Sequence, residues 1–159
     1  MDLGEAKKIV RESFARFERG DMALLDAVDQ IFIAALQCRE LDFTLAESNR
    51  VNVTVEGREN FEVRLPHDRR SIFRTMLARV GAICGYAEGT MEGNGEMKRK
   101  EIEYVKAITR PKPGAPLYLV DADLDVRQPD GTKAQLHVVM QNSGRDLFLR
   151  IENRNNCEP

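Results

Sequence analysis

The hydrophobic periodicity of the chain changes after about residue 50, and this change limits the folds that the chain can adopt. Apolar side chains recur every three or four positions over residues 4–18, and again from Asp21 to about Glu40. From Val51 onward, apolar residues alternate with polar ones. A period near 3.6 indicates helices that bury one face, and a period of 2 indicates half-buried strands. We therefore expect two opening helices and then a sheet.

The remaining elements follow from the same patterns and from the turn residues between them. A first hairpin should turn around Arg58, and Asp68 should cap a third helix whose apolar stripe ends at Cys84. Residues 86–99, rich in Gly and Glu, are expected to form a mobile loop. The six expected strands cover residues 51–55, 61–65, 101–109, 117–127, 133–141 and 146–153. The predicted fold is one α+β domain over residues 1–159, with three helices packed on a curved, mainly antiparallel, cone-like sheet of about six strands.

The turn at Pro129–Gly131 fixes the register of the longest predicted hairpin. Proline presets the first turn position and glycine supplies the left-handed one, which is typical of a three-residue loop with a bulge. Such a loop pairs Gln128 with Thr132 and therefore places Asp123 opposite His137. The apolar residues of both strands then fall on one face, whereas a slip of one residue would place them on opposite faces.

The next turn, near residues 143–144, is expected to have an even loop, which keeps the apolar residues of the last strand on that same face. This register places Arg150 beside His137, and Phe148 beside Val139, on the reverse face of the sheet. Directly opposed residues lie about 5 Å apart, so the Asp123 carboxylate, an imidazole and a guanidinium would converge. The cluster fits either a patch that contacts a ligand or another subunit, or an exposed face with balanced charges.

The two faces of the sheet suggest different kinds of recognition. Val139 and Phe148 are apolar neighbours on an otherwise polar face, which is typical of an interface centre with a charged rim, so we expect a symmetric homodimer. The opposite, apolar face forms the inside of the cone, where Tyr118 is the only polar-tipped residue. An enzyme would bury a polar group there. The pattern therefore favours a module that binds a small apolar ligand or a protein partner over a small cofactor-independent enzyme of isomerase, dehydratase or cyclase type.

The composition argues against several other classes of function. The 159 residues carry 24 Lys and Arg against 26 Asp and Glu, a net charge of −2, so no global charge attracts nucleic acid or an anionic membrane. No apolar run approaches the roughly 18 residues of a membrane helix. Without an export signal, the three cysteines are expected to be free thiols in the cytoplasm. No metal-ligand or cofactor motif occurs, and we expect neither group.

Two segments resemble the nuclear transport factor 2-like superfamily, which includes ketosteroid isomerase and the SnoaL-like polyketide cyclases. The first is Phe17–Leu25, which is similar to that family's opening of a helix, Gly-Asp and a second helix. The second runs from Leu117 through the Pro129–Gly131 turn to Ile151 and resembles the family's long strand meander. The resemblance implies a curved sheet wrapped around the third helix, a conical pocket and, in many members, a dimer. None of the family's catalytic residues matches a position here, so the resemblance implies no reaction.

Overall fold

The computed structural model describes residues 3–45, 50–66, 69–85, 97–109, 119–142 and 147–156, without the side chains of residues 69, 70, 97 and 156. The helices are α1 (Leu3–Glu18), α2 (Leu24–Ala35), α3 (Arg69–Ile83) and a short 3₁₀ helix, η1 (Arg154–Asn156). The strands are β1 (Glu40–Leu45), β2 (Arg50–Val55), β3 (Glu59–Arg64), β4 (Met97–Lys98), β5 (Glu103–Thr109), β6 (Leu119–Arg127), β7 (Lys133–Gln141) and β8 (Phe148–Asn153). The predicted Asp68 cap, Tyr118 in the cone and residues 86–96 of the predicted loop lie outside the described residues.

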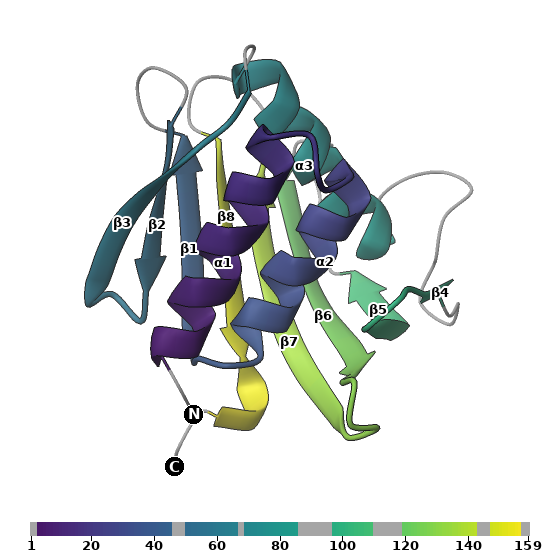
Figure 1. Ribbon diagram of the computed structural model, residues 1–159. Coiled ribbons are helices and arrows are strands. Elements are labelled where there is room, and N and C mark those ends of the chain that lie inside the picture. The colour runs from purple at the N-terminus through teal and green to yellow at the C-terminus, as the bar shows by residue number, and fades with distance from the viewer. Residues whose placement is uncertain are drawn as a thin grey trace.

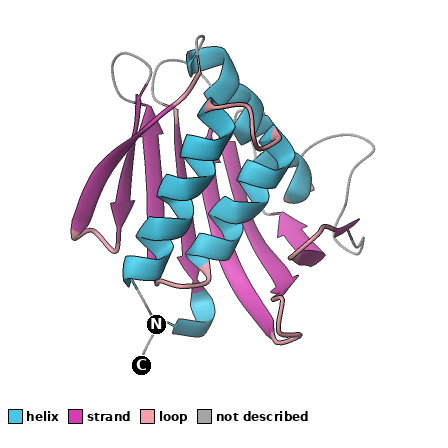
Figure 2. Cartoon of the chain, viewed as in Figure 1, coloured by secondary structure: helices cyan, strands magenta, loops and turns pink. Residues whose placement is uncertain are grey.

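These eight strands form one open antiparallel sheet in the order β3-β2-β1-β8-β7-β6-β5-β4. The three α-helices cover one face of the curved sheet, and no α-helix of the described residues covers the other (Figure 1, Figure 2). The predicted α+β class, with three helices on a curved antiparallel sheet, is confirmed. The expected count of about six strands is low because the sequence analysis does not predict β1 or β4.

Strand β1 begins at Glu40, where the predicted second helix ends, and covers residues for which no element is predicted. α2 ends at Ala35, and Leu41 and Phe43 then alternate with less buried neighbours and are themselves fully buried. β1 pairs with β2 on one side and with β8 on the other, so it joins the two halves of the sheet. The predicted helix end near Glu40 is therefore wrong, because the apolar positions after Ala35 follow the period of a strand.

The start of α2 also differs from the prediction. Asp21 does not cap this helix, whose N-cap is Ala23, without a hydrogen bond from a side chain. Asp21 instead forms an exposed ion pair with Arg19, with Oδ2 and Nε 3.1 Å apart. The carboxylate lies too early in the chain to reach the free N–H groups of the first helical turn.

The first hairpin turns around Gly57 rather than Arg58. Glu56 and Gly57 both adopt the left-handed backbone conformation, with φ of 54° and 67°. Val53 therefore lies opposite Phe61, and every apolar side chain of the hairpin stays on its predicted face. The observed register of β2 and β3 differs from the predicted one by two residues, an even number, so the same side chains face the core.

The register predicted at the Pro129–Gly131 turn is confirmed. The Gln128 N–H donates to the Thr132 carbonyl over 2.8 Å, and Gly131 has a φ of 91°. Glycine adopts this backbone conformation without the steric cost that a Cβ brings. All pairs between β6 and β7 have the predicted register, including Asp123 opposite His137.

The register predicted between β7 and β8 is wrong. Arg150 lies opposite Val139, and Glu152 lies opposite His137. The side chains keep their predicted faces and only their neighbours change. Residues 143–144 lie outside the described part of the chain, and their sequence holds no Pro-Asp-Gly signal that would set the length of the loop.

The inner face of the sheet packs against the helices and forms one core. Phe14 of α1 stacks on Phe43 of β1 with ring centroids 6.3 Å apart, and Phe32 of α2 meets Tyr104 of β5 edge-on at 5.3 Å. The residues assigned to the inside of the cone are Val120, Ala122, Leu124, Leu136, Val138 and Met140. None of these six is more than 2% exposed, so they belong to the packed core.

Replacing Gly131 by alanine is expected to lower the free energy of unfolding by about 1–2 kcal/mol, because a Cβ is strained at a φ of 91°. A Cβ at this position meets no atom within 4 Å, so the expected loss is purely conformational. Gly4→Ala, at an exposed position in α1, is the matched control and should raise the free energy of unfolding by about 0.5–1 kcal/mol. Urea denaturation measures both changes, and changes of the same sign would contradict the assigned turn.

Candidate functional site

The outer face of the sheet, opposite the helices, contains the predicted pair of Asp123 and His137. Asp123 Oδ1 lies 2.8 Å from His137 Nδ1, and Asp121 Oδ1 lies 3.2 Å from Nε2 of the same ring. The His137 and Asp123 side chains are 12% and 11% exposed. Only a ring that is protonated at both nitrogens can donate to both carboxylates. The sequence analysis predicts the first carboxylate and misses the second, although alternate residues of one strand share a face.

Arg150 does not join this pair, contrary to the prediction, because the register of β7 and β8 places it opposite Val139. Its Nε atom lies 2.7 Å from Asp42 Oδ1 and 3.6 Å from Glu40 Oε1, both on β1. The hydrogen bond to Asp42 and the nearby negative charges raise the pKa of the Arg150 guanidinium. Asp42 lies on β1, a strand that is not predicted from the sequence, so this ion pair is not predicted either. The outer face therefore holds two separate charge clusters.

The outer face is also hollowed into a groove of about 610 Å³. Its lining includes both predicted interface residues, Val139 and Phe148, together with the Arg150–Asp42 ion pair. Phe148 lies opposite Gln141 and not opposite Val139, so the two apolar residues are diagonal neighbours on adjacent strands. The groove thus combines an apolar pair with one ion pair.

A second candidate site is built around Asp29, a buried carboxylate of α2 that the sequence analysis does not identify. Its Oδ1 accepts a hydrogen bond from the Tyr104 hydroxyl of β5 at 2.8 Å, and its Oδ2 accepts one from Arg99 Nε at 2.8 Å. Arg99 also donates through Nη2 to Asp26 Oδ1 at 2.9 Å, and Lys100 Nζ lies 3.5 Å from Asp26 Oδ2. Because Asp26 and Asp29 lie three residues apart on one helix face, a single guanidinium bridges both.

Burial governs the electrostatics of this network. It raises the pKa of Asp29, although the hydrogen bonds from Tyr104 and Arg99 oppose the shift. It also raises the pKa of the Tyr104 hydroxyl well above its ordinary value, and the negative charge of Asp29 adds to that shift. The hydrogen bond to Asp29 raises the pKa of the Arg99 guanidinium. Tyr104 therefore serves Asp29 as a neutral donor, and Arg99 serves it as a permanent cation.

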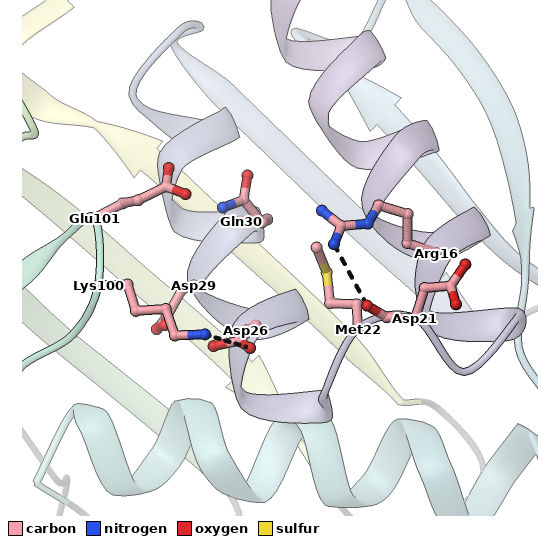
Figure 3. Close-up of a pocket in the computed structure, with 8 residues that line it drawn as sticks. All are labelled: Arg16, Asp21, Met22, Asp26, Asp29, Gln30, Lys100 and Glu101. Atoms are coloured by element: carbon pink, nitrogen blue, oxygen red, sulfur yellow. Dashed lines mark hydrogen bonds and ion pairs between the residues drawn. The ribbon is translucent and has the colours of Figure 1, made fainter.

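A polar pocket of about 280 Å³ adjoins this network (Figure 3). Its lining residues are Arg16, Asp21, Met22, Asp26, Asp29, Gln30, Lys100 and Glu101. Figure 3 shows Lys100 and Glu101 on one side, Arg16 and Asp21 on the other, and residues of α2 between them. The lining holds four carboxylates and two cations, which gives the pocket an acidic character.

Both sites offer charge and shape for binding. The residues that line the polar pocket include no serine, cysteine or histidine, and both oxygens of Asp29 already accept hydrogen bonds. The His137 cluster supplies acid and base groups, but it lies beside the groove and contributes no residue to its lining. Within the described ranges, no group of three His, Cys, Asp or Glu residues is placed to hold a metal ion.

Comparison with protein-family models, with curated proteins and with solved structures finds no match to this chain in any of the three. No helix in the described part of the chain is long and apolar enough to span a membrane. The function is therefore argued from the geometry of the two sites.

Replacing Tyr104 by phenylalanine is expected to lower the free energy of unfolding by about 1–3 kcal/mol, because it removes a donor to the buried Asp29 carboxylate. Chemical denaturation measures the loss. In a protein that already carries Asp29→Ala, the same replacement should cost much less, because the acceptor is gone. Equal losses in the two backgrounds would contradict a direct bond between these side chains.

The two described cysteines, Cys38 and Cys84, are expected to resist thiol reagents in the native protein. Burial raises the pKa of each thiol to about 12, so the reactive thiolate forms only at strongly alkaline pH. A Cys157→Ser variant isolates the two, and a chromogenic disulfide reagent at neutral pH should label them only after denaturation. Rapid labelling of the folded variant would contradict their role as core side chains.

Proposed function

We propose that the protein is a partner-binding module, and that its partner is a second copy of the same chain bound through the outer face of the sheet. The helices cover only the inner face, and the groove that includes Val139 and Phe148 opens on the outer face. An apolar centre with charged residues around it is the usual anatomy of a protein interface.

The observation that carries the proposal is a row of three residues across the outer face. Asp121 of β6, Val139 of β7 and Arg150 of β8 lie side by side in that order. A two-fold axis parallel to β7, midway between two facing sheets, would place Val139 against its own copy. The same axis would place Arg150 of each copy opposite Asp121 of the other. The row is thus self-complementary, as an isologous interface requires.

The end residues of this row are exposed enough to reach another molecule. The Arg150 side chain is 51% exposed and the Asp121 side chain is 40% exposed. Arg150 already binds Asp42 through Nε, but a guanidinium has five N–H donors and can serve a second carboxylate. Facing sheets pack about 10 Å apart, a distance that side chains such as Phe148 would fill.

The proposal places recognition on the outer face rather than in the apolar cone, because the residues of the cone are packed in the core. It agrees with the resemblance of Phe17–Leu25 and of the strand meander to the nuclear transport factor 2-like superfamily, many of whose members are dimers. Membership of that superfamily is part of the proposal.

Sedimentation velocity at micromolar concentration is expected to show a dimer of the 18.1 kDa chain. Arg150→Asp should weaken association about tenfold or more, because carboxylates then face each other across the interface. The double variant with Asp121→Arg and Arg150→Asp rebuilds the row in reverse and should restore the dimer.

Lys8→Glu provides the matched control for these variants. Lys8 is an exposed residue of α1, a helix that covers the inner face of the sheet, and its replacement also reverses a charge. Its replacement should leave the dimer intact. A monomeric wild-type chain, or a folded double variant that stays monomeric, would contradict the proposal.

A further inference from the structure

The turn between β4 and β5 forms one wall of the polar pocket, and its residues 98–103 are called the strap here. A second hollow, of about 300 Å³, lies between the strap and the Pro129–Gly131 turn. Ile102, 2% exposed, is the one buried side chain of the strap. The strap is held by Ile102, by the ion pair of Glu103 with Arg127 and by its contacts with α2.

The ion pairs that tie the strap to α2 end on two carboxylates. Arg99 binds Asp29 through Nε and Asp26 through Nη2, and the more exposed Lys100 reaches Asp26. The Asp29 side chain is 7% exposed, against 26% for Asp26. Asp29 is therefore the buried anchor of the strap, and a change in its charge acts where water screens it least.

We propose that the strap is an acid-loosened wall of the polar pocket: uptake of a proton by Asp29 weakens the bond to Arg99 and lets the strap move away from α2 more often. Ionised Asp29 accepts from the Tyr104 hydroxyl on one oxygen and from Arg99 Nε on the other. A protonated Asp29 can donate from Oδ1 to the Tyr104 hydroxyl, which rotates and accepts. Its Oδ2 still accepts from Arg99 Nε, but without the negative charge that makes the bond strong, so the hold on Arg99 is weakened.

Asp29 faces charged and titratable groups from several parts of the fold. They are Asp26 on α2, Tyr104 on β5, Arg99, Lys100 and Glu101 on the strap, Arg79 on α3, and Arg16 and Asp21 around the junction of α1 with α2. Burial raises the pKa of Asp29 above its ordinary value of 3.8, and the charge of Asp26 adds to the rise. Because Arg99 lowers this pKa while it is bound, its departure raises the pKa further. Proton uptake and release of the strap therefore reinforce each other.

The free energy of unfolding of the whole fold is expected to change with pH in the opposite direction to the stability of the strap. A carboxyl whose pKa is raised by folding contributes its full stabilisation below the ordinary value, and this contribution is lost as the pH rises through the folded pKa. Protonation of Asp29 therefore adds to the free energy of unfolding while it weakens the bond to Arg99. A local opening of the strap, with the sheet intact, distinguishes the proposal from acid unfolding.

Hydrogen exchange of the full chain, followed by nitrogen-15 NMR, tests the proposal independently of the dimer. The Arg99 Nε–H reports the bond to Asp29, and the Arg99 backbone N–H, which donates to the Ile102 carbonyl over 3.0 Å, reports the turn. Protection factors remove the intrinsic pH dependence of exchange. As the pH falls from neutral into the acid range, protection of the wild-type Nε–H should fall about tenfold or more, while the amides of β6 and β7 keep theirs.

Three variants complete the test. Asp29→Asn should show low protection of the Arg99 Nε–H at both pH values, and Asp21→Asn, which alters the same pocket without a contact to the strap, should behave as the wild type. Arg99→Gln leaves the buried carboxylate in place and should give low protection of the backbone N–H of residue 99 at both pH values. Three results would overturn the proposal. The first is constant protection of the Arg99 Nε–H in the wild type, and the second is wild-type protection of this group in Asp29→Asn. The third is a pH response of the backbone N–H of residue 99 that persists in Arg99→Gln.

Discussion

The antiparallel pairing of β1 with β8 joins the two halves of this sheet, and both the core and the groove of the outer face depend on it. β1 begins the hairpin half and β8 ends the strand meander, and Leu41 lies opposite Ile151 with both side chains fully buried. The same ladder places Asp42 opposite Arg150 on the outer face. One set of backbone hydrogen bonds thus closes the core under the helices and sets the charges around the groove. Because successive side chains of a strand alternate between faces, neither result is obtained without the other.

How far the sequence predicts this sheet depends on the chemistry of each turn. Pro129–Gly131 admits one loop geometry, so the pairing of Asp123 with His137 follows from the sequence alone. The turn before β8 has no such signal, and the apolar pattern sets only the parity of its loop. The residue of β7 that lies opposite Arg150 can then change by two positions without any change in the apolar pattern. β1 is not predicted because its alternation is short: Leu41, Phe43 and Leu45 alternate with polar residues over six positions, directly after the predicted helix.

The partners of Asp29 cannot be predicted from the sequence for a different reason. Arg99 and Tyr104 lie 70 and 75 residues away along the chain and meet Asp29 only when α2 packs against the sheet. The one local signal is an acidic residue among buried apolar positions of α2, such as Val28 and Phe32. A buried carboxylate needs donors, so this signal predicts that partners exist. It does not predict which residues they are, because contacts between distant segments leave no spacing in the sequence.

The charged side chains of the two sites differ in their exposure to solvent, and this difference decides which site can bind another molecule. Each oxygen of Asp29 already has a donor and the side chain is 7% exposed, so little of this carboxylate is open to an outside molecule. Arg150, by contrast, is half exposed and has donors left after it binds Asp42. Exposed ion pairs of this kind contribute only about 0–1 kcal/mol to folding, so little stability is lost when one of them rearranges around a partner. The buried network is therefore suited to holding or releasing a segment of its own chain, and the outer face of the sheet, which no described helix covers, is suited to recognising another molecule.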